Sequence, residues 1–223
     1  MRIENKACMS ESYLNKLKEL TTKIEEELLD LDLSEFKGIN IEYDSSFPSL
    51  SDGRTNNKTI ILPKNRTENN LDNKIDMVKS TIIHELYHID LSNRLPRIHS
   101  EFSTALKTEK YIKGYTILTY IEYITHLKST KYENEELKNS FIKSINRKKW
   151  NFENEEDKIY MIKAAPYIIA RDPELLKIEN KILKNNLSEI KRELERLNRI
   201  EINDDYFCLS KLEKIVKKYI IDY

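Results

Sequence analysis

The spacing of apolar side chains predicts a mostly helical chain with a small sheet near its N-terminus. Residues 11–31 carry Leu and Ile at helical intervals with charged residues on the other face, which predicts an amphipathic helix. Residues 39–44 alternate apolar and polar positions, and residues 59–63 form a short, Ile-rich run. Both patterns predict strands, which can pair in one sheet. The polar stretches 47–58 and 64–73 predict loops.

The rest of the chain predicts further helices. Residues 74–93 carry an apolar stripe at intervals of three and four residues, which predicts a helix packed in the core. Residues 115–127 are almost wholly apolar, which predicts a helix buried on most of its circumference and starting after Gly114. Amphipathic spacing predicts the remaining helices at residues 98–112, 133–147, 154–170, 174–199 and 204–221.

These elements predict a predominantly helical α+β protein. With three glycines in 223 residues, the chain has few positions for the positive-φ turns that a strand-rich fold needs. The composition becomes charge-rich beyond residue 131. We therefore divide the chain into a domain at residues 1–130, which contains the sheet, and a helical C-terminal extension at residues 131–223, packed on that domain.

Composition and charge limit the cellular compartments and the classes of binding partner that fit this chain. Lys and Arg together number 38, as do Asp and Glu, so the chain has no overall attraction for nucleic acid or anionic lipid. The two cysteines, Cys8 and Cys208, do not suggest a disulfide framework and favour a reducing compartment. No apolar run has the length of a membrane span or a signal peptide. The sequence predicts a cytoplasmic protein without a nucleic-acid or membrane partner.

The clearest chemical signature is an H-E-x-x-H motif at residues 84–88, inside the predicted helix 74–93. Residues four apart share one face of a helix, so the imidazoles of His84 and His88 can converge on one ion. Zinc lowers the pKa of its bound water to about 7, and a carboxylate beside that water can accept its proton. The motif predicts a Zn²⁺ site with Glu85 as the general base. The alternative is a pair of core histidines bonded to the backbone.

A catalytic zinc site takes a third protein ligand and leaves the fourth position to water. The metzincin pattern requires a histidine where Arg94 stands, so that class is excluded. Glu122 is the favoured third ligand, because it is a lone carboxylate in the most apolar predicted helix, where an unpaired charge is costly. A lysine, an arginine or a tyrosine hydroxyl could satisfy it instead. Glu101 and His99 remain alternatives, whereas Asp90 points to another side of its helix.

A hydrogen-bond donor for the oxyanion would complete a peptidase site. His126 stands four residues after Glu122, so it can reach the same region from the same helix face. Tyr87, Tyr120 and Tyr123 are further candidates for this role. With 13 tyrosines in the chain, packing in the core is the more common explanation for each of them.

Three segments, TIILPKN, KSTIIHELYHI and LTYIEYITHL, together resemble a known family. Over residues 38–130 the chain is similar to zincin-type metallopeptidases of phages and mobile elements in Firmicutes, distant relatives of the ImmA/IrrE-like peptidases. In that group a helix of the form aromatic-x-Glu-aromatic carries the third zinc ligand, and residues 120–123 match it with Glu122. The resemblance implies a gluzincin-like fold, with two metal-bearing helices and a short sheet whose edge binds an extended substrate. The chain departs from the family in having Leu86 and Tyr87 between the histidines.

The first functional hypothesis is a zinc-dependent peptidase with His84, His88 and Glu122 as ligands and Glu85 as base. Its substrate would be a protein or peptide, and by analogy with the family a regulatory protein. The alternative is a helical protein-interaction module with a structural or vestigial zinc site. Glu85 favours the enzyme, because a structural site needs no general base and prefers four protein ligands.

Overall fold

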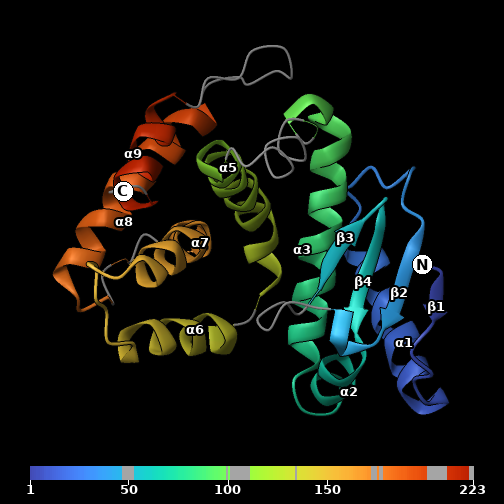
Figure 1. The fold of residues 1–223 in the computed structure, drawn as a ribbon. Helices are drawn as coiled ribbons and strands as arrows, with labels where there is room; N and C mark the ends of the chain where they lie inside the picture. The colour runs from blue at the N-terminus through green and yellow to red at the C-terminus, as the bar shows by residue number, and fades with distance from the viewer. Residues whose placement is uncertain are drawn as a thin grey trace. The chain divides into compact units, whose positions relative to one another are not determined.

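The computed structural model describes most of the chain (Figure 1). The described residues are 1–46, 53–98, 100, 111–133, 135–171, 175, 178–199 and 210–220. They are predominantly helical and include a four-stranded sheet, which confirms the predicted α+β class. The helix predicted at residues 98–112 lies mostly outside them. Within these ranges, no helix combines the length and the apolar character that a membrane span requires.

The chain forms two compact units. The first unit is Met1–Asp90 with Tyr132–Asn134, and the second is Leu91–Lys131 with Glu135–Tyr223. The change in composition predicts a division after residue 130. The boundary between the compact units falls between Asp90 and Leu91, inside the helix predicted at residues 74–93. The apolar helix near residue 120 belongs to the second unit, because it packs with the helices that follow it.

The first unit contains the sheet, with strand order β1-β2-β4-β3. β1 (Ile3–Asn5), β2 (Gly38–Glu42) and β4 (Thr59–Pro63) run parallel, and β3 (Arg54–Asn56) pairs antiparallel with β4 at one edge. The predicted strands at 39–44 and 59–63 are therefore confirmed as β2 and β4. The fully buried side chains of these two central strands are Ile39, Ile41, Ile60 and Leu62.

The prediction of a loop at residues 47–58 is wrong for residues 54–56, which form β3. Asn57 and Lys58 have φ values of 48° and 62°, and they form the two-residue turn between β3 and β4. Positive φ at both positions matches the turn type that suits the twist of a hairpin. β3 has three residues and no apolar alternation, so its sequence carries no strand pattern. The earlier part of the predicted loop, residues 47–52, lies outside the described residues.

Three helices complete the first unit: α1 (Glu11–Glu27), α2 (Lys64–Asn73) and part of α3 (Ile75–Arg94). α1 and α3 confirm the predicted helices with small changes at their ends. α2 replaces a predicted loop, so that prediction is wrong. Its buried residues are Thr67 and Leu71, and this narrow face is too short for the helical period to stand out from a polar sequence.

The core of the first unit fixes how α3 is rotated about its axis. Ile82, Leu86 and Ile89 are fully buried and Val78 is 4% exposed, in a cluster that also contains side chains of α1 and the sheet. Ile75, the first residue of the predicted stripe, is 45% exposed and does not belong to this core. Burying each large apolar side chain stabilises the fold by about 1.5–3 kcal/mol, so this face of α3 is strongly held inward.

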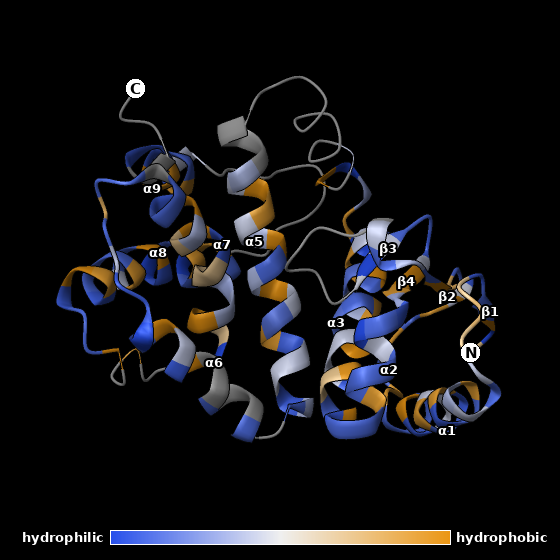
Figure 2. Cartoon of the chain, turned by 60° about the horizontal axis from the view of Figure 1, so that its bottom comes forward, coloured by the Kyte–Doolittle hydropathy of each residue, from blue (hydrophilic) through white to orange (hydrophobic). Residues whose placement is uncertain are grey.

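The described helices of the second unit surround a separate core. They are α5 (Tyr111–Ser129), α6 (Glu135–Arg147), α7 (Glu155–Arg171), α8 (Lys181–Arg199) and α9 (Ser210–Ile220). α5 contacts α7, α8 and α9, which explains why its sequence is apolar around most of the helix. α8 buries five Leu and Ile side chains, and Figure 2 shows the apolar and polar residues that alternate along this amphipathic helix.

Two boundaries in the second unit differ from the sequence prediction. Gly114 lies inside α5 rather than before its start. The helix predicted at residues 174–199 begins at Lys181 in the structure. The side-chain oxygen of Asn180 accepts a hydrogen bond of 3.0 Å from the backbone N–H of Leu183, and this cap defines the start of α8.

Candidate metal centre

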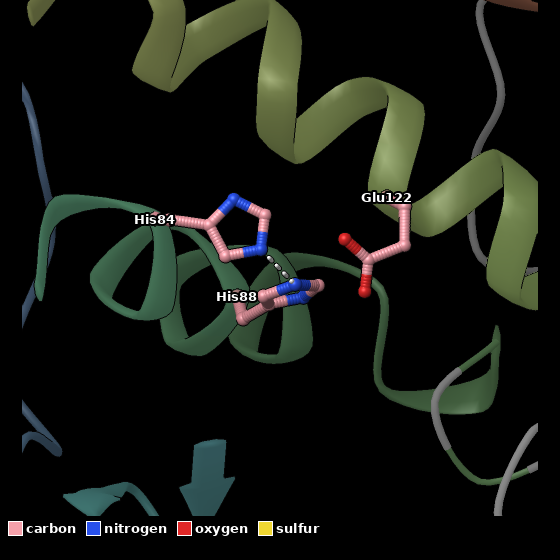
Figure 3. A group of neighbouring side chains, drawn as sticks. All are labelled: His84, His88 and Glu122. Carbon is pink, nitrogen blue, oxygen red and sulfur yellow. Dashed lines mark hydrogen bonds between the residues drawn. The ribbon is translucent and has the colours of Figure 1, made fainter. Parts of the chain in front are cut away.

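α3 places His84 and His88 one turn apart on the same side of the helix, as their spacing predicts. Both residues are half-buried, beside the face of α3 that is buried in the core. Their Nε2 atoms are 3.0 Å apart, and the rings meet edge to face with centroids separated by 4.6 Å (Figure 3). The two rings therefore present one nitrogen each to the same point in space.

This nitrogen separation suits a shared metal ion. Two imidazole nitrogens, each about 2.05 Å from a tetrahedral zinc, lie about 3.3 Å apart. The Nε2 atoms of His84 and His88 are 3.0 Å apart, so a shift of a few tenths of an ångström is enough. Imidazole is also among the ligands that zinc prefers. Both the donor chemistry and the distance fit a zinc ion.

Glu85 lies in the same turn of α3 and is 8% exposed. Its carboxylate oxygen Oε2 accepts a hydrogen bond from the hydroxyl of Thr55, on the edge strand β3. The same hydroxyl lies 3.4 Å from the backbone carbonyl oxygen of Glu85. Thr55 carries no signal in the sequence, because it falls in a stretch whose polar composition predicts a loop. Two separate elements, α3 and β3, therefore set the position of the Glu85 side chain.

Glu122 is carried by α5, in the second unit. Its side chain is 26% exposed and its Oε2 lies 3.6 Å from Nε2 of His126, one helical turn further along. His84 and His88 belong to the first unit and Glu122 to the second, and each of the three offers one atom of a kind that can bind a metal ion. The role of Glu122 as the third ligand stays a prediction.

His126 is 14% exposed and packs against a neighbouring helix of its own unit. Its ring meets the ring of Tyr167 edge to face, with centroids 5.1 Å apart. The guanidinium carbon Cζ of Arg171 lies 3.1 Å from the centroid of the same tyrosine ring. Because its Nε2 faces Glu122, this imidazole can orient the Glu122 carboxylate. Its predicted role as a donor to the oxyanion stays a prediction.

The three candidate tyrosines belong to the cores of their units. Tyr87 is 1% exposed and lies 6.4 Å, between ring centroids, from Tyr132. Tyr120 and Tyr123 are 4% and 3% exposed in the second unit. Burial, with a smaller contribution from Tyr123, raises the pKa of Tyr120 to about 12. Burial is also the main cause that raises the pKa of Tyr123, followed by the charge of Glu195. These positions support the packing interpretation.

Of the remaining alternative ligands, Asp90 lies among the described residues. Asp90 is 5% exposed and ends the part of α3 that belongs to the first unit. It is two residues past His88, so it points away from the two imidazoles. His99 and Glu101 lie outside the described residues.

Comparison of the chain with models of protein families, with curated proteins and with solved structures finds no match. The resemblance to zincin-type peptidases therefore stays an expectation from three sequence segments. The interpretation of the site depends on its own residues and their geometry.

Proposed function

We propose that this chain is a zinc-dependent peptidase. The observation that carries the proposal is the pair of imidazole Nε2 atoms 3.0 Å apart on α3, with the buried carboxylate of Glu85 in the same helical turn. The distance and the donor chemistry of the imidazoles suit zinc. The adjacent carboxylate is the group that a hydrolytic site requires in addition to its ligands.

In this proposal His84, His88 and Glu122 would hold the metal. When bound, zinc would act as a Lewis acid and lower the pKa of water at the site to about 7. An oxygen of the Glu85 carboxylate accepts a proton from the attacking water and then gives it to the leaving amine of the substrate. His126 orients Glu122 through the contact between Nε2 and Oε2.

We propose a protein or peptide in an extended conformation as the substrate. β3 ends the strand order of the sheet and pairs with β4 on one side only among the described strands. A strand edge of this kind offers backbone N–H and C=O groups to an added peptide strand. Through the hydrogen bond from Thr55 to Glu85, this edge is joined to the proposed general base.

Bound zinc and peptide hydrolysis, measured on the same variants, test the proposal. Elemental analysis gives the zinc content of wild type, His84→Ala and Glu85→Gln, and a peptide library or a denatured protein serves as substrate. We expect His84→Ala to lose both zinc and activity. Glu85→Gln should keep zinc and lose about 10²–10⁴-fold in kcat, because general-base catalysis contributes that much.

The same measurements separate the enzyme from the alternative, an interaction module with a structural or vestigial zinc site. Such a module would bind zinc without hydrolysing any peptide. If Glu85→Gln hydrolysed peptides as fast as the zinc-loaded wild type, the mechanism proposed for Glu85 would be wrong.

A further inference from the structure

The edge strand β3 contacts α3 at the turn that carries the proposed general base. Thr55 is the middle residue of β3 and pairs with Ile60 on β4. Its hydroxyl donates a hydrogen bond to Oε2 of Glu85, thirty residues further along the chain. Both residues belong to the first unit, so the contact lies within one compact body.

A second contact holds β3 against the same face of α3. Gly53 directly precedes β3, and a Cβ atom at this position would lie 2.7 Å from Cγ2 of Thr81. Such an approach is too close for any other residue unless this residue or the Thr81 side chain shifts. Thr81 stands one helical turn before Glu85, so Gly53 and Thr55 pack along one line on α3. The Thr55 hydroxyl is therefore presented from a strand that is closely seated on the helix.

The geometry limits what the Glu85 carboxylate can do. A glutamate side chain has three rotatable bonds, and the hydrogen bond at Oε2 restricts the directions that the carboxylate can take. Threonine suits this task because its β-branched side chain has few rotamers, so the hydroxyl is itself held in place. With one hydrogen bond from Thr55 already at Oε2, the second oxygen, Oε1, is the more available one to accept a proton.

We propose that Thr55 is a positioning residue, which orients the Glu85 carboxylate for proton transfer from water. This inference rests on the proposed peptidase function. In this role the Thr55 hydroxyl touches neither the metal nor the substrate, and it acts through Glu85 alone. Removing its hydroxyl should therefore change the rate of the chemical step and leave zinc binding and substrate binding as they are.

The test compares Thr55→Val, which keeps the shape and removes the hydroxyl, with Thr55→Ser, which keeps the hydroxyl. Both are measured in the full chain loaded with zinc, by steady-state hydrolysis of the peptide substrate. We expect Thr55→Val to lower kcat about tenfold, the kinetic equivalent of one hydrogen bond to a charged group. KM and zinc content should stay at the wild-type values, and Thr55→Ser should restore kcat to within about threefold of wild type.

A double variant shows whether Thr55 acts through Glu85. In the Glu85→Gln background the carboxylate is absent, so Thr55→Val should cause little further loss of kcat. A full tenfold loss in that background would overturn the inference, and so would Thr55→Val with wild-type kcat or Thr55→Ser as slow as Thr55→Val. Zinc-loaded wild type that hydrolyses no peptide would overturn the proposed function and this inference together. An active wild type with unchanged Thr55→Val overturns the inference alone.

Discussion

The position of the two histidines depends on the buried face of α3, and Leu86→Ala tests this dependence. Leu86 lies between the histidines in the chain and is fully buried in the core of the first unit. The substitution removes three carbon atoms, which costs about 2.4 kcal/mol from lost burial alone. The cavity that remains adds to this cost, and measured Leu→Ala changes in cores reach about 2.7–5.0 kcal/mol. We expect Leu86→Ala to reduce the free energy of unfolding by about 3 kcal/mol.

Leu29→Ala is the matched control, because it is the same chemical change in the same unit at a side chain that is 88% exposed. It should change the free energy of unfolding by no more than about 0.5 kcal/mol. Urea denaturation followed by far-ultraviolet circular dichroism gives both values. This signal reports the helices of both units, so the transition of the first unit is the part that Trp150 fluorescence does not follow. The single tryptophan, Trp150, belongs to the second unit, so its fluorescence should report a transition that Leu86→Ala leaves in place. Equal urea midpoints for the two variants would refute the claim that this face holds α3.

Two further predictions concern the third ligand and an ionised carboxyl group of the second unit. Glu122→Gln should lower zinc retention during dialysis against a weak chelator, because a neutral amide is a poorer zinc ligand than a carboxylate; retention equal to wild type would exclude Glu122 as a ligand. In the second unit, the backbone N–H of Asn151 at 2.7 Å and the ammonium of Lys148 at 2.6 Å hold the pKa of Asp157 below its ordinary value. A carboxyl group whose pKa is lower in the folded chain stabilises the fold at pH values above its ordinary pKa, near 4. This contribution disappears as the pH falls through the pKa of the folded state. Asp157→Asn should therefore lower the urea midpoint at pH 7, measured by Trp150 fluorescence, with a difference from wild type that shrinks below about pH 4.

The part of the site that could be predicted from the sequence is the part that is local in the chain. His84 and His88 share one face of α3 because the helical repeat places them there, and the apolar stripe predicted the helix within a residue at each end. No knowledge of the tertiary fold was needed for this pair. The same reasoning placed Glu122 in a helix, which α5 confirms.

The Thr55 contact could not be predicted, because it joins residues thirty positions apart through a strand of three residues. So short a strand shows no alternation, and its pairing with β4 is set by a turn at Asn57 and Lys58. α2 was missed for a related reason, since only Thr67 and Leu71 are buried on it. In both places the tertiary structure decides the local conformation, and the polar composition hides it.

The buried carboxylates of this chain differ in how their charge is balanced, and the difference bears on the metal. Glu193 is 6% exposed and forms an ion pair with Arg196 at 2.5 Å, and Asp157 is paired with Lys148 at 2.6 Å. Glu85 is as well buried, yet the described residues provide it with a neutral hydroxyl and no ion pair. A buried carboxylate without a cation is costly. A divalent ion on the adjacent imidazoles would balance this charge, which is why the burial of Glu85 supports a metal-dependent site rather than a pair of packed histidines.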